Sequence, residues 1–131
     1  MLVVTAERIL MAVILIVEDN VFIREVAEMM IQGWGHRTLS ASDGEEALSL
    51  LSSPQHVDAL FTDIYLKTAV LGGFDLAHLA IKLRPKLRVL YATGNSITDK
   101  MKTLFVAGAA FLPKPYSERE LQVSIEDLLA A

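Results

Sequence analysis

The sequence contains no cysteine, and this absence excludes several kinds of site and scaffold. Without thiols the chain has no disulfide framework, no thiolate zinc site and no cysteine nucleophile. It also lacks a glycine-rich loop that ends in Lys-Ser or Lys-Thr, the motif with which many nucleotide-binding proteins hold phosphate. The three histidines are scattered, with no pair four residues apart, so they do not predict a metal site. A chain without cysteine suits a reducing compartment, and we expect a cytoplasmic protein.

Long hydrophobic runs and an excess of positive charge are also missing. An apolar run extends from Ile9 to Val17, but it stops at the carboxylates of Glu18 and Asp19. A membrane-spanning helix needs about 20 apolar residues, and a signal peptide needs small residues after its apolar stretch. The net charge of −4 argues against a nucleic-acid-binding face. We therefore expect neither membrane nor nucleic acid as a partner, and interpret the run as a buried strand that ends at a charged site.

Short β-rich segments alternate with segments of helical periodicity along the 131 residues. The expected strands are residues 13–17, 36–41, 58–62, 87–92 and 109–113. Apolar residues recur at helical spacing near 22–30, 76–83, 97–105 and 121–128, and capping boxes at Ser42–Glu45 and Ser117–Glu120 indicate two helix starts. Apolar strands that alternate with helices predict an α/β fold, a doubly wound five-stranded parallel sheet with helices on both faces.

No linker divides the chain, so we expect a single domain over residues 12–131. Residues 1–11 are interpreted as an N-terminal extension, and Met11 is an alternative start of the natural protein. No further domain is expected after the last helix, which predicts a stand-alone protein.

Residues able to do chemistry follow the ends of four expected strands. They are Glu18 and Asp19, Asp63, Thr93, and Lys114. In such sheets the functional site lies beyond the carboxyl ends of the strands. Three clustered carboxylates do not all stay ionised without a cation, and ligands that are all oxygen suit Mg²⁺. A lysine and a hydroxyl opposite the metal can bind phosphate oxygens, which leaves one carboxylate to attack phosphorus. Each residue alone has an ordinary structural interpretation, but their joint placement favours a phosphoryl-transfer site.

The stretches that carry these residues resemble the receiver domain of two-component response regulators. They are ILIVEDN (14–20), DALFTDIYL (58–66), LYATG (90–94) and AAFLPKPY (109–116), and the resemblance covers about residues 12–130. It implies the flavodoxin-like strand order 2-1-3-4-5. It also implies a signalling protein that catalyses its own phosphorylation and dephosphorylation. The phosphodonor would be a sensor histidine kinase or a histidine phosphotransfer protein.

The resemblance assigns roles around a Mg²⁺ cofactor. Asp63 would be the phosphoacceptor and, like Asp19, a direct ligand of the metal. Glu18 would hold the metal mainly through water, and Tyr65 would contribute its backbone carbonyl. The bulky ring of Tyr65 predicts a long-lived phosphoryl group, unless the loop carries the ring away from the site.

Further roles concern phosphate binding and switching. Lys114 would bind the phosphoryl group and form a cis peptide with Pro115. Thr93 would move towards the phosphoryl group after transfer, and Phe111 stands at the position of the switching aromatic residue. The downstream protein would bind the face formed by the helix near 97–105, the strand at 109–113 and the last helix.

The chain departs from the family pattern beside the expected acceptor. Lys67 stands where the family usually has a proline, and the connection YLKTAVLGG (65–73) is longer than in most relatives. Three other functions share part of this residue pattern. A haloacid-dehalogenase-type phosphatase needs a second acid where Tyr65 stands. Flavodoxin-like FMN binding gives no reason for the charge set. A receiver-like adapter that acts only by protein binding, without phosphorylation, stays open.

Overall fold

The structure is a computed structural model and describes residues 11–67 and 71–131. Five parallel strands form one sheet in the order β2-β1-β3-β4-β5. Their bounds are Val13–Val17 (β1), Arg37–Ala41 (β2), Ala59–Asp63 (β3), Arg88–Thr93 (β4) and Ala110–Pro113 (β5). The predicted fold class and strand order are confirmed. Apart from Met11, the expected N-terminal extension lies outside the described residues.

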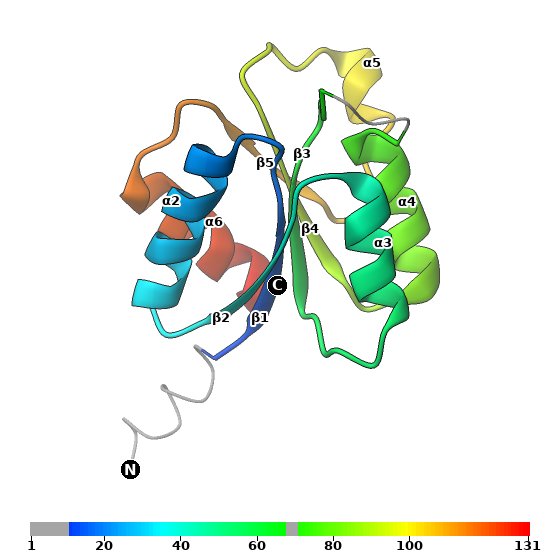
Figure 1. Ribbon diagram of the computed structural model, residues 1–131. Helices are drawn as coiled ribbons and strands as arrows, with labels where there is room; N and C mark the ends of the chain where they lie inside the picture. Colours follow the sequence, from blue (N-terminus) through cyan, green and yellow to red (C-terminus); the bar gives the residue numbers. More distant parts are fainter. Residues whose placement is uncertain (1–10, 68–70) are drawn as a thin grey trace.

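Helices cover both faces of the sheet (Figure 1). One face carries α2 (Val21–Gly33) and α6 (Glu118–Ala130), and the other carries α3 (Gly44–Ser52) and α4 (Gly73–Leu83). The short α5 (Asp99–Lys102) lies at the top of the view, beyond the carboxyl end of β4. Within the described ranges, every helix is too short or too polar to cross a bilayer.

Strand β1 shows why the sequence needs two apolar layers. Successive side chains point to opposite faces of a strand. Leu15 and Val17 therefore pack with α3 and α4, whereas Ile14 and Ile16 pack with α2 and α6. All four are almost fully buried. A strand covered on both faces reads as a continuous apolar run, which is the pattern seen before Glu18.

The capping box predicted at Ser117 and Glu120 is present at the start of α6. The box predicted at Ser42 and Glu45 is wrong by one residue. The side chain of Asp43 accepts the N–H of Glu46 at 2.8 Å, and Glu46 in turn accepts the N–H of Ser42. This later start places Ala47 and Leu51 on the buried side of α3.

The helix predicted near residues 97–105 is shorter than expected. After α5 the chain continues through tight turns, in which each N–H bonds three residues back: Thr103 to Lys100, Leu104 to Met101 and Phe105 to Lys102. Phe105 thereby packs its ring against Tyr91 of β4, at a centroid distance of 4.7 Å. Aromatic packing explains the apolar periodicity that predicted a longer helix.

Candidate functional site

Three acids meet at the carboxyl end of the sheet. Glu18 and Asp19 follow β1, and Asp63 ends β3, the strand that pairs with β1. One carboxylate oxygen from each lies within 4.8 Å of the others. Glu18 and Asp63 are buried, whereas Asp19 is partly exposed. A cluster of oxygen donors this tight fits a hard cation such as Mg²⁺.

Lys114 lies between two of these acids. Its Nζ is 2.7 Å from Oε1 of Glu18 and 2.7 Å from Oδ1 of Asp63. Backbone pairing fixes both chain segments, since the N–H of Lys114 bonds to Thr93 O and the N–H of Ile64 bonds to Ala92 O, each at 2.9 Å. The Lys114–Pro115 peptide is cis, the geometry expected from the resemblance.

Burial and charge change the acid–base properties of this cluster. Burial, together with the neighbouring Glu18, raises the pKa of Asp63 to about 7, although the Lys114 ammonium opposes the change. For Lys114, burial alone would lower the pKa, but its contacts with Asp63 and Glu18 outweigh burial and raise the pKa. One ammonium therefore faces two buried carboxylates, and the ionised form of Asp63 stays disfavoured. A bound cation would supply additional positive charge and favour the ionised carboxylate.

Backbone and side-chain donors hold the acid pair of β1 in place. The N–H of Asn20 donates to Oε2 of Glu18 at 3.0 Å, and the Arg24 guanidinium donates to the carbonyl of Glu18 at 2.7 Å. The N–H of Lys67 donates to Oδ2 of Asp19 at 2.6 Å. Burial raises the pKa of Asp19, but the bond from Lys67 and its neighbours hold this pKa below its usual value. Thus Asp19 is held in its ionised form.

Thr93 and Phe111, the predicted switch pair, border one surface groove. Thr93 is buried at the end of β4, and its Oγ1 accepts the N–H of Asn95 at 3.2 Å. Phe111 is half-buried, with its ring centroid 6.5 Å from that of Phe105. The groove between them is also lined by Phe105 and Lys114. It therefore extends from Lys114, which contacts two of the acids, to the rings of Phe105 and Phe111.

Tyr65 lies apart from the other predicted site residues. Its side chain is 57% exposed, and it borders a hollow with Phe74 and His78 of α4. The pocket at the acid cluster is lined by Asp63 and Lys114, among other residues. Tyr65 is not among them. The ring of Tyr65 therefore does not line the pocket around the acids.

Glycine is required at the start of α4. A Cβ on Gly73 would lie 2.0 Å from the carbonyl oxygen of Asp63 and 2.8 Å from Cα of Ile64. The N–H of Gly73 also donates to Ile64 O at 2.8 Å. The first turn of α4 therefore packs directly against the backbone that carries Asp63.

Sequence analysis missed several residues at this site. Tyr116 borders the same pocket as Asp63 and packs on Phe61, and burial raises its pKa to about 12. Its place directly after the Lys-Pro pair was the available signal. Arg24 carried a weaker signal, as a lone cation in an apolar helix segment. The Lys67 N–H, a backbone donor, carried none.

A comparison with known protein families matches most of this chain. The family model described as "Response regulator receiver domain" matches residues 14–126. An uncharacterized transcriptional regulatory protein of Bacillus subtilis, YrkP, is 31% identical over 113 residues, which cover 86% of this chain and 47% of the relative. A second one, YbdJ, is 29% identical and is matched over 50% of its length. The chain thus spans about half the length of the curated relatives it matches.

Solved structures agree with this family match. A response regulator receiver protein from Sinorhizobium medicae superposes with a TM-score of 0.84 at 23% identity, covering 92% of this chain and 95% of that one. NtrX from Brucella abortus, solved in complex with ATP, gives a TM-score of 0.82 at 29% identity, covering 91% of this chain and 27% of that one.

Proposed function

Because the chain belongs to the response regulator receiver domain family, we propose that it accepts a phosphoryl group on Asp63 in a Mg²⁺-dependent reaction. The donor in this proposal is the phosphohistidine of a sensor histidine kinase or of a histidine phosphotransfer protein. The location is cytoplasmic. The observation that carries the proposal is the position of one buried carboxylate, Asp63, whose oxygen lies within 4.8 Å of oxygens from two further acids and 2.7 Å from Nζ of Lys114.

The chemistry follows from these positions. The Asp63 carboxylate attacks phosphorus, an O–P bond forms, and the N–P bond of the phosphohistidine breaks with its electron pair going to the imidazole nitrogen. Lys114 stabilises the negative charge on the transferred group, since it already lies 2.7 Å from Asp63. Asp19, Asp63 and the backbone carbonyl of Tyr65 would hold Mg²⁺ directly, and Glu18 would hold it mainly through water. When bound, this ion neutralises charge on the acids and on the phosphoryl oxygens.

The pKa of Asp63 gives a physical reason for the metal requirement. With a pKa of about 7, a large share of Asp63 is protonated at neutral pH, and a protonated carboxyl is a poor nucleophile. A divalent cation between the acids favours the ionised form. Protonation alone removes only about half of the nucleophile at pH 7, so most of the expected metal requirement comes from the charge that the ion would neutralise on the phosphoryl oxygens.

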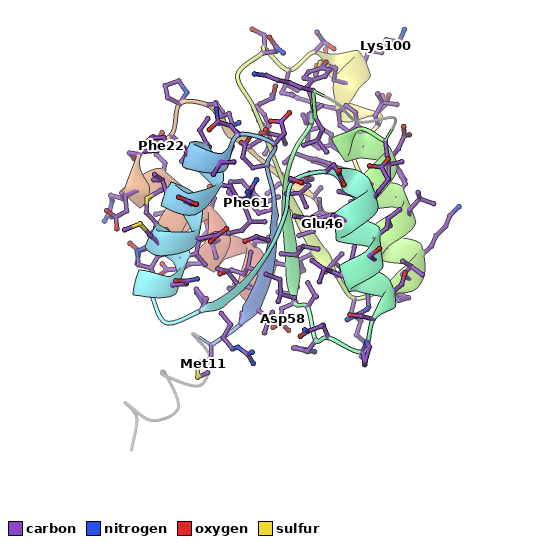
Figure 2. All side chains as sticks on the ribbon, in the orientation of Figure 1. Met11, Phe22, Glu46, Asp58, Phe61 and Lys100 are labelled. Carbon is purple, nitrogen blue, oxygen red and sulfur yellow. The ribbon has the colours of Figure 1, made fainter. Side chains whose placement is uncertain are left out.

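The surface beside Lys114 supports a protein as the donor. On α2, the side chain of Phe22 is 75% exposed, and Ile23 and Val26 are each 36% exposed. Together with Pro115 and Tyr116 these residues line an apolar groove that reaches Lys114. Figure 2 shows Phe22 at the same end of the molecule as the carboxyl ends of the strands, far from Asp58 at the opposite end. A protein bound there could present its phosphohistidine to Asp63.

The signal would leave through a second face, formed by α5, β5 and α6. After phosphorylation, Thr93 would move towards the phosphoryl group, and the ring of Phe111 would take up the space released. Phe111 has no hydroxyl, so burying its ring requires no polar desolvation. NMR spectra of Phe111 with and without a phosphate mimic test this step. Identical ring environments in the two states would exclude it.

Phosphorylation itself can be tested with a small phosphodonor. Wild-type protein incubated with acetyl phosphate and Mg²⁺ should gain one phosphoryl group, detected by intact mass, and should gain none when the metal is chelated. Asp63→Asn should stay unlabelled. Asp75→Asn, which removes an exposed acid in the first turn of α4, is the matched control and should be labelled normally. Labelling of Asp63→Asn would show that the acceptor is another residue. No labelling of any variant by any donor would favour the unphosphorylated adapter.

A further inference from the structure

The backbone N–H of Lys67 makes a long-range contact with the acid cluster. Lys67 lies four residues after Asp63, at the position where the family usually carries proline. Its N–H donates to Oδ2 of Asp19 at 2.6 Å, across 48 residues of sequence. Proline has no N–H and could not form this bond. The bond therefore requires a residue other than proline at position 67.

The contact restrains the carboxylate closest to solvent in the acid cluster. Asp19 is partly exposed, whereas Glu18 and Asp63 are buried and both bonded to Lys114. Asp19 has no bond to that lysine among its contacts. Its other hydrogen bonds come from the adjacent Glu18 and from its own backbone, so the Lys67 N–H is the contact that fixes the carboxylate relative to the segment after β3. Groups that orient metal ligands in this way typically change metal affinity by about 10–100-fold.

We propose that the N–H of Lys67 is a positioning group for the metal, holding Asp19 in the orientation in which its carboxylate binds Mg²⁺. The inference rests on the proposed function in one respect, namely that the acid cluster binds Mg²⁺. The side chain of the same residue acts in the opposite direction. Its ammonium is attracted to Asp19 and so opposes the arrival of a second cation.

The opposed effects can be separated with two substitutions. Lys67→Ala removes the ammonium but keeps the N–H, and Lys67→Pro removes both. Because the side chain is exposed, loss of its charge should tighten Mg²⁺ binding by no more than about threefold. Loss of the N–H should weaken binding by about tenfold or more relative to Lys67→Ala. The affinities come from calorimetric or NMR titration with Mg²⁺ alone. Equal affinities of the two variants, within about twofold, would overturn the proposal.

A measurement on the wild-type protein tests the same coupling without any substitution. If the N–H bond strengthens Mg²⁺ binding, then Mg²⁺ must strengthen the N–H bond by the same factor. Saturating Mg²⁺ should therefore slow amide hydrogen exchange at Lys67 by about tenfold. Gly73, whose N–H bonds to Ile64 O in the same connection, is the internal control and should change much less. Unchanged or faster exchange at Lys67, or equal slowing at Gly73, would overturn the positioning role.

The outcomes also separate this inference from the proposed function. If wild-type protein binds Mg²⁺ and Lys67→Pro binds it as tightly as Lys67→Ala, only the positioning role fails. If wild-type protein does not bind Mg²⁺, both proposals fail. Should Lys67→Pro not fold, as judged by circular dichroism, the exchange measurement decides alone.

Discussion

Replacing Asp63 by asparagine should make the metal-free protein more stable. The pKa of this carboxyl rises from 3.8 to about 7 on folding, mainly because of burial. Between these two values the folded state keeps a proton that the unfolded state has released, so stability falls as pH rises through this window. Above pH 7 the full cost is present, and it amounts to about 4 kcal/mol. Asparagine has the same shape, does not ionise, and avoids this cost.

Urea unfolding in the presence of a chelator measures the effect. Asp63→Asn should unfold with a free energy about 4 kcal/mol above that of the wild type at pH 8, and about 2 kcal/mol above it at pH 5. Saturating Mg²⁺ should shrink the difference, because the ion binds the folded wild type. Asp127→Asn, at an exposed position of α6, is the matched control and should change stability by less than about 0.5 kcal/mol. An Asp63→Asn variant no more stable than the wild type at pH 8, or a gain independent of pH, would refute the reasoning.

Three further predictions concern residues around and away from the site. Burial lowers the pKa of His36, whose Nδ1 accepts the N–H of Ala12 at 3.1 Å. This contribution to stability is complete above about pH 6.5 and declines below it, so the stability difference between the wild type and His36→Asn, measured by urea unfolding, should change below that pH in the direction that disfavours the wild type; a difference that stays constant with pH would disprove it. Tyr91→Phe should lower the unfolding free energy by about 1–3 kcal/mol, because it leaves the buried N–H of Val106 without an acceptor. The control Tyr65→Phe, at an exposed position, should have almost no effect, and equal urea midpoints for the two variants would contradict the prediction. Tyr65→Asn should leave the lifetime of the phosphorylated protein in saturating Mg²⁺ nearly unchanged, because the side chain at this position borders the hollow beside α4 and not the pocket around Asp63; faster decay in the variant would show that the side chain reaches the phosphoryl group.

The sheet was predictable because burial on both faces leaves a strong trace in sequence. Leu15 and Ile16 point to opposite apolar layers, so β1, which lies between these layers, has no polar residue until it ends. The acids could also be predicted as neighbours, since parallel strands bring their carboxyl ends to one edge. Sequence therefore located Glu18, Asp19 and Asp63 on the same edge before any distance was known.

Two kinds of feature were not predictable from the sequence: hydrogen bonds donated by the backbone, and the exact residues at which helices begin and end. The bond from Lys67 to Asp19 uses an N–H that every residue except proline has, so no residue type indicates it. The cap of α3 was predicted at Ser42 and is Asp43. Both side chains can cap a helix, and only the packing of the helix decides between them. Phe105 followed helical spacing, but its ring is held by Tyr91 in a turn.

The most direct test of the central claim is phosphotransfer from the host's own histidine kinases and histidine phosphotransfer proteins. Each phosphorylated donor is mixed with the wild-type protein, Mg²⁺ and, in parallel, with Asp63→Asn. The account predicts rapid transfer from at least one donor to the wild type, none to Asp63→Asn, and a phosphopeptide that contains Asp63. Transfer that persists in Asp63→Asn, or wild-type protein that takes no phosphate from any donor, would contradict it.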